Sequence, residues 1–289
     1  MSKRKKGVRW KERTFHKAVQ MELREHKSSF IVFSILRFLV IVTLVRQIML
    51  HNYESSFLCL LTLLLLYVPS LVQVQLHIEL PPVLEITVLC FIFASEILGE
   101  INAFFIVIPF WDTLLHTLNG FLAAAVGFSM VSLLNDNDRL TFDLSPFYLA
   151  LAAFCFSMTI GVLWEFFEFG MDTFFHTDMQ KDTVVHAIYS VALDPTNTNK
   201  VVAVTGITDA AVNGGSLGLG GYLDIGLIDT MQDLLVNFVG AAVFSIAGYF
   251  YSKGKGQNKS AAADFVPSRK RADRDFLKRA REETEETGE

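Results

Sequence analysis

The stretch PFYLALAAFCFSMTIGVLWEFFEFGMDTFF occupies residues 146–175 and decides the fold class. It begins at Pro146, a residue that suits the first position of a helix because no hydrogen bond from its nitrogen is needed there. The stretch contains no Lys or Arg, and it exceeds the roughly 20 apolar residues that cross the hydrocarbon core of a bilayer. It therefore predicts a transmembrane helix.

Similar apolar runs occur in the rest of the chain. They indicate further spans at about residues 30–50, 57–76, 83–105, 112–134 and 225–251. The composition agrees, because 52% of the 289 residues are hydrophobic, 26 are Phe, and the mean hydropathy is +0.39. Soluble, disordered, fibrous and disulfide-stapled classes are excluded. The predicted fold is an all-α polytopic membrane protein, a bundle of about six transmembrane helices.

Basic residues concentrate at the two ends of the chain. Residues 1–27 hold 10 Lys and Arg and residues 252–289 hold another 10, out of 25 in total. Because basic segments beside spans stay in the cytoplasm, both termini are predicted to be cytoplasmic. The even number of spans agrees, since it places both termini on the same side of the membrane. We expect a multi-pass protein of the plasma membrane. Nucleic-acid binding is not expected, since the basic residues flank spans.

Three regions follow from this topology. They are a basic cytoplasmic segment at 1–29, a six-helix transmembrane domain at 30–251, and a charged cytoplasmic tail at 252–289. The tail is expected to be disordered, with a helix near 273–286 as the alternative. An outer loop covers 176–224. Its run Val201–Val204 is typical of a strand, and its glycine-rich stretch Gly214–Gly221 lacks the Lys-Ser/Thr of a phosphate-binding loop and is expected to be flexible.

Polar residues inside the spans fall in groups at helical spacing, so each group shares one helix face. The groups are Glu96 with Glu100, Asp112 with His116, Glu165 with Glu168 and Asp172, and Asp229 with Asp233. Because successive spans run in opposite directions, all four groups are predicted to lie in the outer half of the membrane. Asn119 and Asn237 extend this polar face to greater depth.

So many acids in an apolar environment need a bound cation, shared protons or water. Carboxylates on facing helices, with a nearby His, are how helical bundles hold two-metal centres. Such ligands suit Mg, Mn, Ca or Zn. The predicted metal ligands are Asp112, His116, Glu165, Asp229 and Asp233, and Glu168 is the predicted general base on a metal-bound water. Further polar residues of the site would be Glu96, Glu100, Asn119, Asp172 and Asn237.

The same motifs resemble a bacterial family. They are Leu98-Gly99-Glu100, the segment Pro109–His116, the segment Trp164–Glu168, and the segment Asp229–Asp233. Over about residues 30–250 they resemble the YjdF-type inner-membrane proteins, for which no activity is established. The last span is also similar to that of VanZ-like membrane proteins, which are linked to glycopeptide-antibiotic tolerance at the cell envelope. Glu168 stands where that family usually has Gln, so this second similarity is looser.

Three functions remain open at this point. The first is a metal-dependent enzyme acting on a lipid-linked or phosphorylated substrate of the cell envelope. The second is a proton- or cation-coupled transporter or flippase, in which the acids form a relay. The third is a non-catalytic envelope or partner-binding protein that uses the outer loop and the tails. The bilayer is the expected partner in all three, and a small-molecule substrate in the first two.

Overall fold

The computed structural model describes residues 3–135, 144–254 and 261–286. Its contacts divide the chain into two compact units, residues 1–158 with 237–289, and residues 159–236. Six helical segments are long and apolar enough to cross a membrane, which confirms the expected fold class. They are Lys27–Met49, Tyr53–Leu76, Pro82–Ile101, Trp111–Leu134, Pro146–Phe175 and Leu227–Lys253. The expected tail, 252–289, lies partly outside the described residues.

The first unit opens with α1 (Lys3–Leu23) and α2 (Lys27–Met49). The second span is broken into α3 (Tyr53–Leu65) and α4 (Val68–Leu76). The break falls just before Pro69, because proline has no N–H to donate to the preceding turn and begins a new helix instead. Pro69 thus breaks the second span into two helices, although the apolar run by itself predicts one continuous helix.

The third span changes its helix type along its length. It starts as α5 (Pro82–Phe93) and continues as the π-helix η1 (Ala94–Ile101). It ends at Ala103, whose φ of 57° is left-handed, so the predicted span 83–105 was a few residues too long. The short α6 (Phe104–Val107) then leads to α7 (Trp111–Asn135). The last two spans are α8 (Pro146–Phe175) and α9 (Leu227–Lys253), each with a part in both units.

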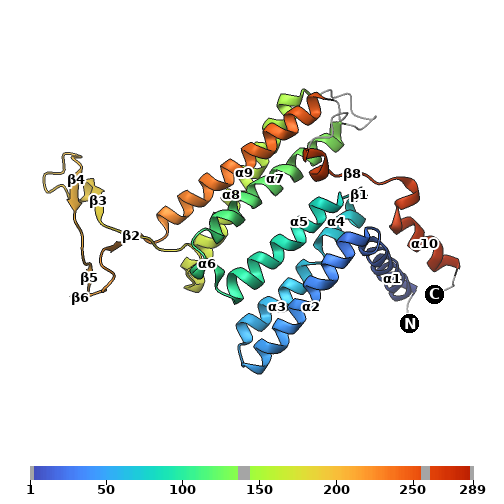
Figure 1. Ribbon diagram of the computed structural model, residues 1–289, viewed down its shortest axis with the longest axis horizontal. Coiled ribbons are helices and arrows are strands. Elements are labelled where there is room, and N and C mark those ends of the chain that lie inside the picture. The colour runs from blue at the N-terminus through green and yellow to red at the C-terminus, as the bar shows by residue number, and fades with distance from the viewer. Residues whose placement is uncertain (1–2, 136–143, 255–260, 287–289) are drawn as a thin grey trace. The chain divides into compact units, whose positions relative to one another are not determined.

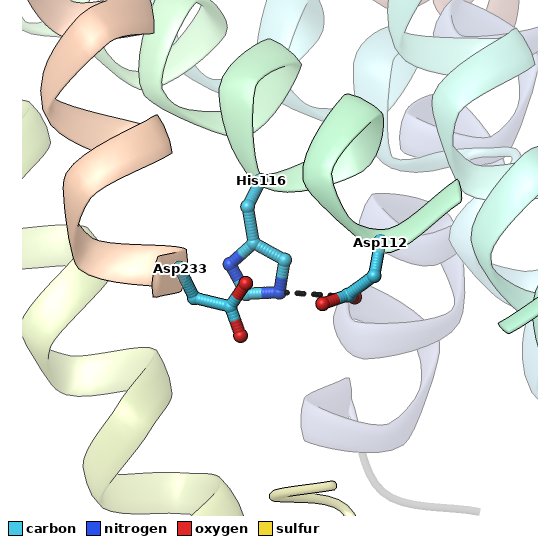
Figure 2. Close-up of side chains that lie close together, drawn as sticks. All are labelled: Asp112, His116 and Asp233. Atoms are coloured by element: carbon cyan, nitrogen blue, oxygen red, sulfur yellow. Dashed lines mark ion pairs between the residues drawn. The ribbon is translucent and has the colours of Figure 1, made fainter. Parts of the chain in front are cut away.

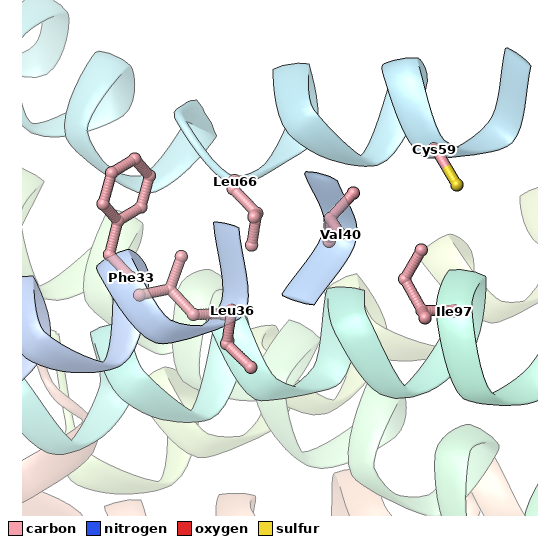
Figure 3. Close-up of a cluster of buried hydrophobic side chains, with 7 residues drawn as sticks. Phe33, Leu36, Val40, Cys59, Leu66 and Ile97 are labelled. Atoms are coloured by element: carbon pink, nitrogen blue, oxygen red, sulfur yellow. The ribbon is translucent and has the colours of Figure 1, made fainter. Parts of the chain in front are cut away.

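The helices α2, α3, α5 and η1 of the first unit pack around one apolar cluster (Figure 3). Its members are Phe33, Leu36, Val40, Cys59, Leu66, Leu89 and Ile97. Many large apolar side chains on the same helices are instead exposed, such as Phe38 at 64% and Leu64 at 69%. Exposed apolar surface on spanning helices is what a hydrocarbon solvent requires.

The terminal segments of the chain pack together in the first unit (Figure 1). Helix α10 (Phe276–Glu286) buries Phe276 and Ala280 against Ala18 and Val19 of α1. Helix α10 lies within residues 273–286, where a helix was predicted as the alternative to disorder. Strand β8 (Ser268–Arg269) pairs antiparallel with β1 (Ile78–Glu79). Two short 3-10 turns, η3 (Ala261–Phe265) and η4 (Ala272–Arg274), lie on either side of β8.

A buried ion pair holds the tail in place. Lys270 contacts the carboxylate of Glu22, and both side chains are almost fully buried. Burial lowers the pKa of the Lys270 ammonium to about 8, opposed by the negative charge of Asp275. Arg274 pairs with both Glu25 and Glu79. In the sequence, the basic residues of the tails served only to predict the membrane topology. In the structure, Lys270 and Arg274 also hold the two ends of the chain together.

The second unit contains the loop 176–224, which forms short antiparallel ladders. Strand β3 (Ala187–Ser190) pairs with β4 (Val202–Thr205), and β2 (Val184–Val185) pairs with β7 (Tyr222–Leu223). The 3-10 turn η2 (Val191–Leu193) follows β3. The strand expected near 201–204 is therefore present.

The glycine-rich stretch begins with a hairpin of β5 (Ala211–Val212) and β6 (Gly215–Ser216). Its turn residues, Asn213 and Gly214, have φ of 52° and 82°. Positive φ at both positions is typical of the Asn-Gly turns that join two strands. The pair Asn213-Gly214 is thus a hairpin signal at the start of the stretch Gly214–Gly221, which was expected to be a flexible loop.

Candidate functional site

Three buried carboxylates come together in the second unit. They are Glu165 and Glu168 of α8 and Asp233 of α9, with exposed fractions of 5%, 7% and 4%. Each offers one carboxylate oxygen, and these three oxygens all lie within 4.8 Å of one another. We call these residues the carboxylate group. Like charges this close are stable only with a cation, a shared proton or strong hydrogen bonds.

The burial pattern on α8 explains why these acids face inward. Glu165 and Glu168 lie on the buried face, whereas Phe166, Phe167 and Phe169 are 66%, 49% and 60% exposed. The sequence thus places aromatic rings toward the membrane and acids toward the interior on the same turns of the helix. Trp164 donates its indole N–H to Oε1 of Glu168 at 2.8 Å, which fixes the orientation of that carboxylate.

Two further acids of this unit hold the ends of the loop 176–224. Asp172 accepts hydrogen bonds from the backbone N–H groups of Met179 and Gln180, at 2.7 and 2.8 Å. Asp229 accepts one from the backbone N–H of Lys181 at 2.7 Å. Asp229 was predicted to be a metal ligand, and Asp172 a further polar residue of the site. Both carboxylates have contacts that fasten the loop to the helices, and their predicted roles in the site stay predictions.

In the first unit, Asp112 and His116 form the pair expected from their spacing. Nε2 of His116 lies 3.5 Å from Oδ1 of Asp112, one turn apart near the start of α7, and both are partly buried. Figure 2 shows this pair, and it also draws Asp233 of the second unit. A carboxylate beside an imidazole favours one ring orientation, which is what a metal-binding or proton-transferring His requires.

Asn119 and Asn237 lie deeper in the first unit and contact each other. Nδ2 of Asn119 donates to Oδ1 of Asn237 at 3.3 Å, and Asn237 is only 1% exposed. The neighbouring hydroxyl of Ser157 donates to the carbonyl of Gly120 at 2.7 Å. The predicted polar extension along α7 and α9 is thus a buried hydrogen-bond network that also reaches α8.

The helices α7 and α9 touch at their backbones beside this network. A Cβ atom at Gly120 would overlap the carbonyl of Asn237, and one at Gly240 would overlap the carbonyl of Thr117. Only glycine permits so close an approach. The contact leaves no space between α7 and α9 at this level.

Glu96 and Glu100 both lie on the π-helix η1, Glu96 partly buried and Glu100 exposed. Trp111, at the start of α7, donates its indole N–H to the carbonyl of Ala94 at 3.3 Å, so η1 is held beside α7. Single π-helical turns are frequent at functional sites. The structure thus places this pair beside α7 in the first unit.

One buried polar pair was missed by sequence reasoning. Nε2 of Gln73 donates to Oε1 of Glu85 at 3.4 Å, and these side chains are 1% and 4% exposed. Oε1 of Gln73 accepts from the backbone N–H of Leu80 at 2.9 Å. The available signal was an acid and an amide on opposite sides of Pro81-Pro82, where the chain turns between two spans.

Fold and site together define a class, the multi-pass α-helical membrane proteins with acidic residues buried among their spans. The chain belongs to the family described as "Predicted membrane protein (DUF2238)", whose family model matches residues 31–254. No curated protein and no solved structure matches the chain. The family match confirms the expected membrane protein. The YjdF-type and VanZ-like resemblances stay predictions.

Proposed function

We propose that this protein binds a divalent cation through the carboxylate group and uses it on a phosphorylated or lipid-linked substrate of the cell envelope. The observation that carries the proposal is the convergence of three buried carboxylate oxygens within 4.8 Å. Mg, Mn and Ca prefer oxygen ligands, and Zn accepts them when an imidazole is added. A bound cation also offsets the cost of burying several negative charges.

In this proposal Glu165 and Asp233 would hold the cation, the cation would activate a water molecule, and Glu168 would be the general base. The hydrogen bond from Trp164 holds Glu168 in one orientation, as a general base requires. The cation would lower the pKa of that water toward about 7. Asp112, His116 and Asp229 remain proposed ligands on the sequence argument alone, as do the plasma-membrane location and the cytoplasmic termini.

The test is the metal content of the detergent-purified protein, measured by plasma mass spectrometry after incubation with Mg, Mn, Ca and Zn. We expect about one or two equivalents in the wild type, as in carboxylate-bridged helical centres. Glu165→Gln and Asp233→Asn should both lose the metal. Asp178→Asn, an exposed acid of the same unit, is the matched control and should retain it.

Absence of metal from the folded wild type would contradict this proposal. A proton- or cation-coupled transporter would then become the better candidate, and one observation favours it. The half-buried amide of Asn119 and the buried amide of Asn237 are hydrogen-bonded to each other further along α7 and α9 than the helix starts. Cysteine labelling at positions 119 and 237 separates the two functions, because transport requires aqueous access from both sides and an enzyme from one. The close contact at Gly240 supports access from one side only.

A further inference from the structure

The first unit contains a groove that shares no residue with the carboxylate group. This groove of about 850 Å³ runs between α1, α2, α3 and α4. Its lining is largely aromatic and aliphatic, and includes Phe33, Phe38 and Ile41 of α2 and Leu64 of α3. Its volume is in the range of sites that enclose a small molecule. The groove therefore joins a helix outside the spans, α1, to two of the spans themselves.

Two arginines line this apolar groove. Arg24 lies between α1 and α2, and Arg37 lies within the first span, where its guanidinium stacks over the ring of Tyr67 at 5.6 Å from the centroid. Ten residues separate Arg37 from the start of α2 at Lys27, which corresponds to roughly 15 Å along the helix. None of the described residues that line the groove is acidic. A cation at this depth in a span is costly without an anion beside it.

We propose that the groove binds one anionic phospholipid of the bilayer, its phosphate on Arg24 and Arg37 and one acyl chain along Phe33, Phe38 and Leu64. Arginine matches the geometry of a phosphate with two parallel hydrogen bonds. The contact with Tyr67 holds the Arg37 guanidinium in place for this. The acyl chain covers side chains that already face the hydrocarbon, such as Phe38 and Leu64. The occupant therefore needs both a negative headgroup and a hydrocarbon tail.

The test is native mass spectrometry of the full-length protein, delipidated in detergent and titrated with phosphatidylglycerol or phosphatidylcholine of identical acyl chains. We expect the wild type to bind phosphatidylglycerol about tenfold more tightly, a difference that R24Q/R37Q should abolish. The matched control is Arg46→Gln, which changes an exposed arginine of the same helix outside the groove and should leave the preference intact.

Val68→Trp provides a second test that keeps both arginines. Val68 lines the groove, so an indole there should fill it and weaken phosphatidylglycerol binding by about tenfold. The proposal is overturned if Arg46→Gln lowers binding as much as R24Q/R37Q, or if Val68→Trp binds as the wild type does. It is also overturned if inorganic phosphate displaces the lipid at equal concentration, since the acyl chain would then contribute nothing.

Discussion

At the scale of single residues, Gly240 tests the close approach of α7 and α9. A Cβ atom there would overlap the carbonyl oxygen of Thr117, a backbone atom that cannot rotate away. We expect Gly240→Ala to destabilise the protein by about 1–3 kcal/mol, the usual cost of overpacking. Thermal unfolding in detergent measures it.

Gly170 of α8 is the matched control for this substitution, because a Cβ atom at that position meets nothing within 4 Å. Gly170→Ala is expected to be neutral, or stabilising by about 0.5–1 kcal/mol through helix propensity. Equal loss of stability in both variants would show that close contact is not the reason for glycine at position 240.

Asp194 holds a turn of the loop 176–224 and makes this turn sensitive to pH. Its carboxylate accepts from the hydroxyl of Thr196 and from the backbone N–H groups of Thr196, Lys200 and Thr198, and these hydrogen bonds keep the pKa of Asp194 far below the ordinary 3.8. Because the pKa is depressed in the folded turn, the stabilisation is complete above pH 3.8 and is lost as the pH falls below it.

Amide hydrogen exchange in residues 194–200 measures this effect. We expect Asp194→Asn to exchange faster than the wild type at pH 7, and the difference between the two to shrink as the pH falls below about 4. Faster tryptic cleavage after Lys200 in Asp194→Asn is the accompanying result. Identical protection in the two proteins at pH 7 would show that the carboxylate does not hold the turn.

At the scale of elements, the Glu22–Lys270 pair determines whether the C-terminal segment stays docked on α1 and β1. Lys270→Met leaves the Glu22 carboxylate buried without its cation, and such a loss costs about 3–5 kcal/mol. Replacing both residues, as in E22L/K270M, removes both charges and should restore most of the stability.

Thermal unfolding and the rate of tryptic release of α10, both at pH 7, measure this double-mutant cycle. The pH is chosen below the Lys270 pKa of about 8, so that the ammonium is mostly charged. Lys17→Gln is the comparison, because its ion pair with Glu283 is exposed and should contribute less than about 1 kcal/mol. A Lys270→Met protein as stable as the wild type would contradict the role of the buried pair.

At the scale of the whole molecule, the contacts of the terminal helices bear on membrane topology. Helices α1 and α10 lie outside the spans and pack against each other, with Lys17 paired to Glu283 at 2.9 Å. Two segments in contact must lie on one side of a bilayer, as an even number of spans requires. We predict that reporters of cytoplasmic location are active at both termini and inactive in the loop 176–224. Opposite locations for the two termini would exclude the six-span topology.

Much of the fold follows from local sequence. The apolar runs predicted all six spans, because the length needed to cross hydrocarbon is set by the bilayer and recorded in consecutive residues. The breaks within them were harder to predict. Pro69 is the local signal for the break in the second span, and Asn213-Gly214 is the local signal for a hairpin in the loop 176–224. The π-helical turn at Ala94–Ile101 has no signal of that kind and is held by the contact with Trp111.

The sequence by itself determined that paired acids would lie on the faces of spanning helices, since spacing along a helix fixes which side chains share a face. Only the tertiary structure decided which acids meet. Glu165 and Glu168 are joined by Asp233, whereas Asp229, one turn earlier on the same helix, binds the loop. The docking of Lys270 on Glu22 was likewise beyond the sequence. These contacts join residues far apart in the chain, and their partners are chosen by packing, which no local spacing encodes.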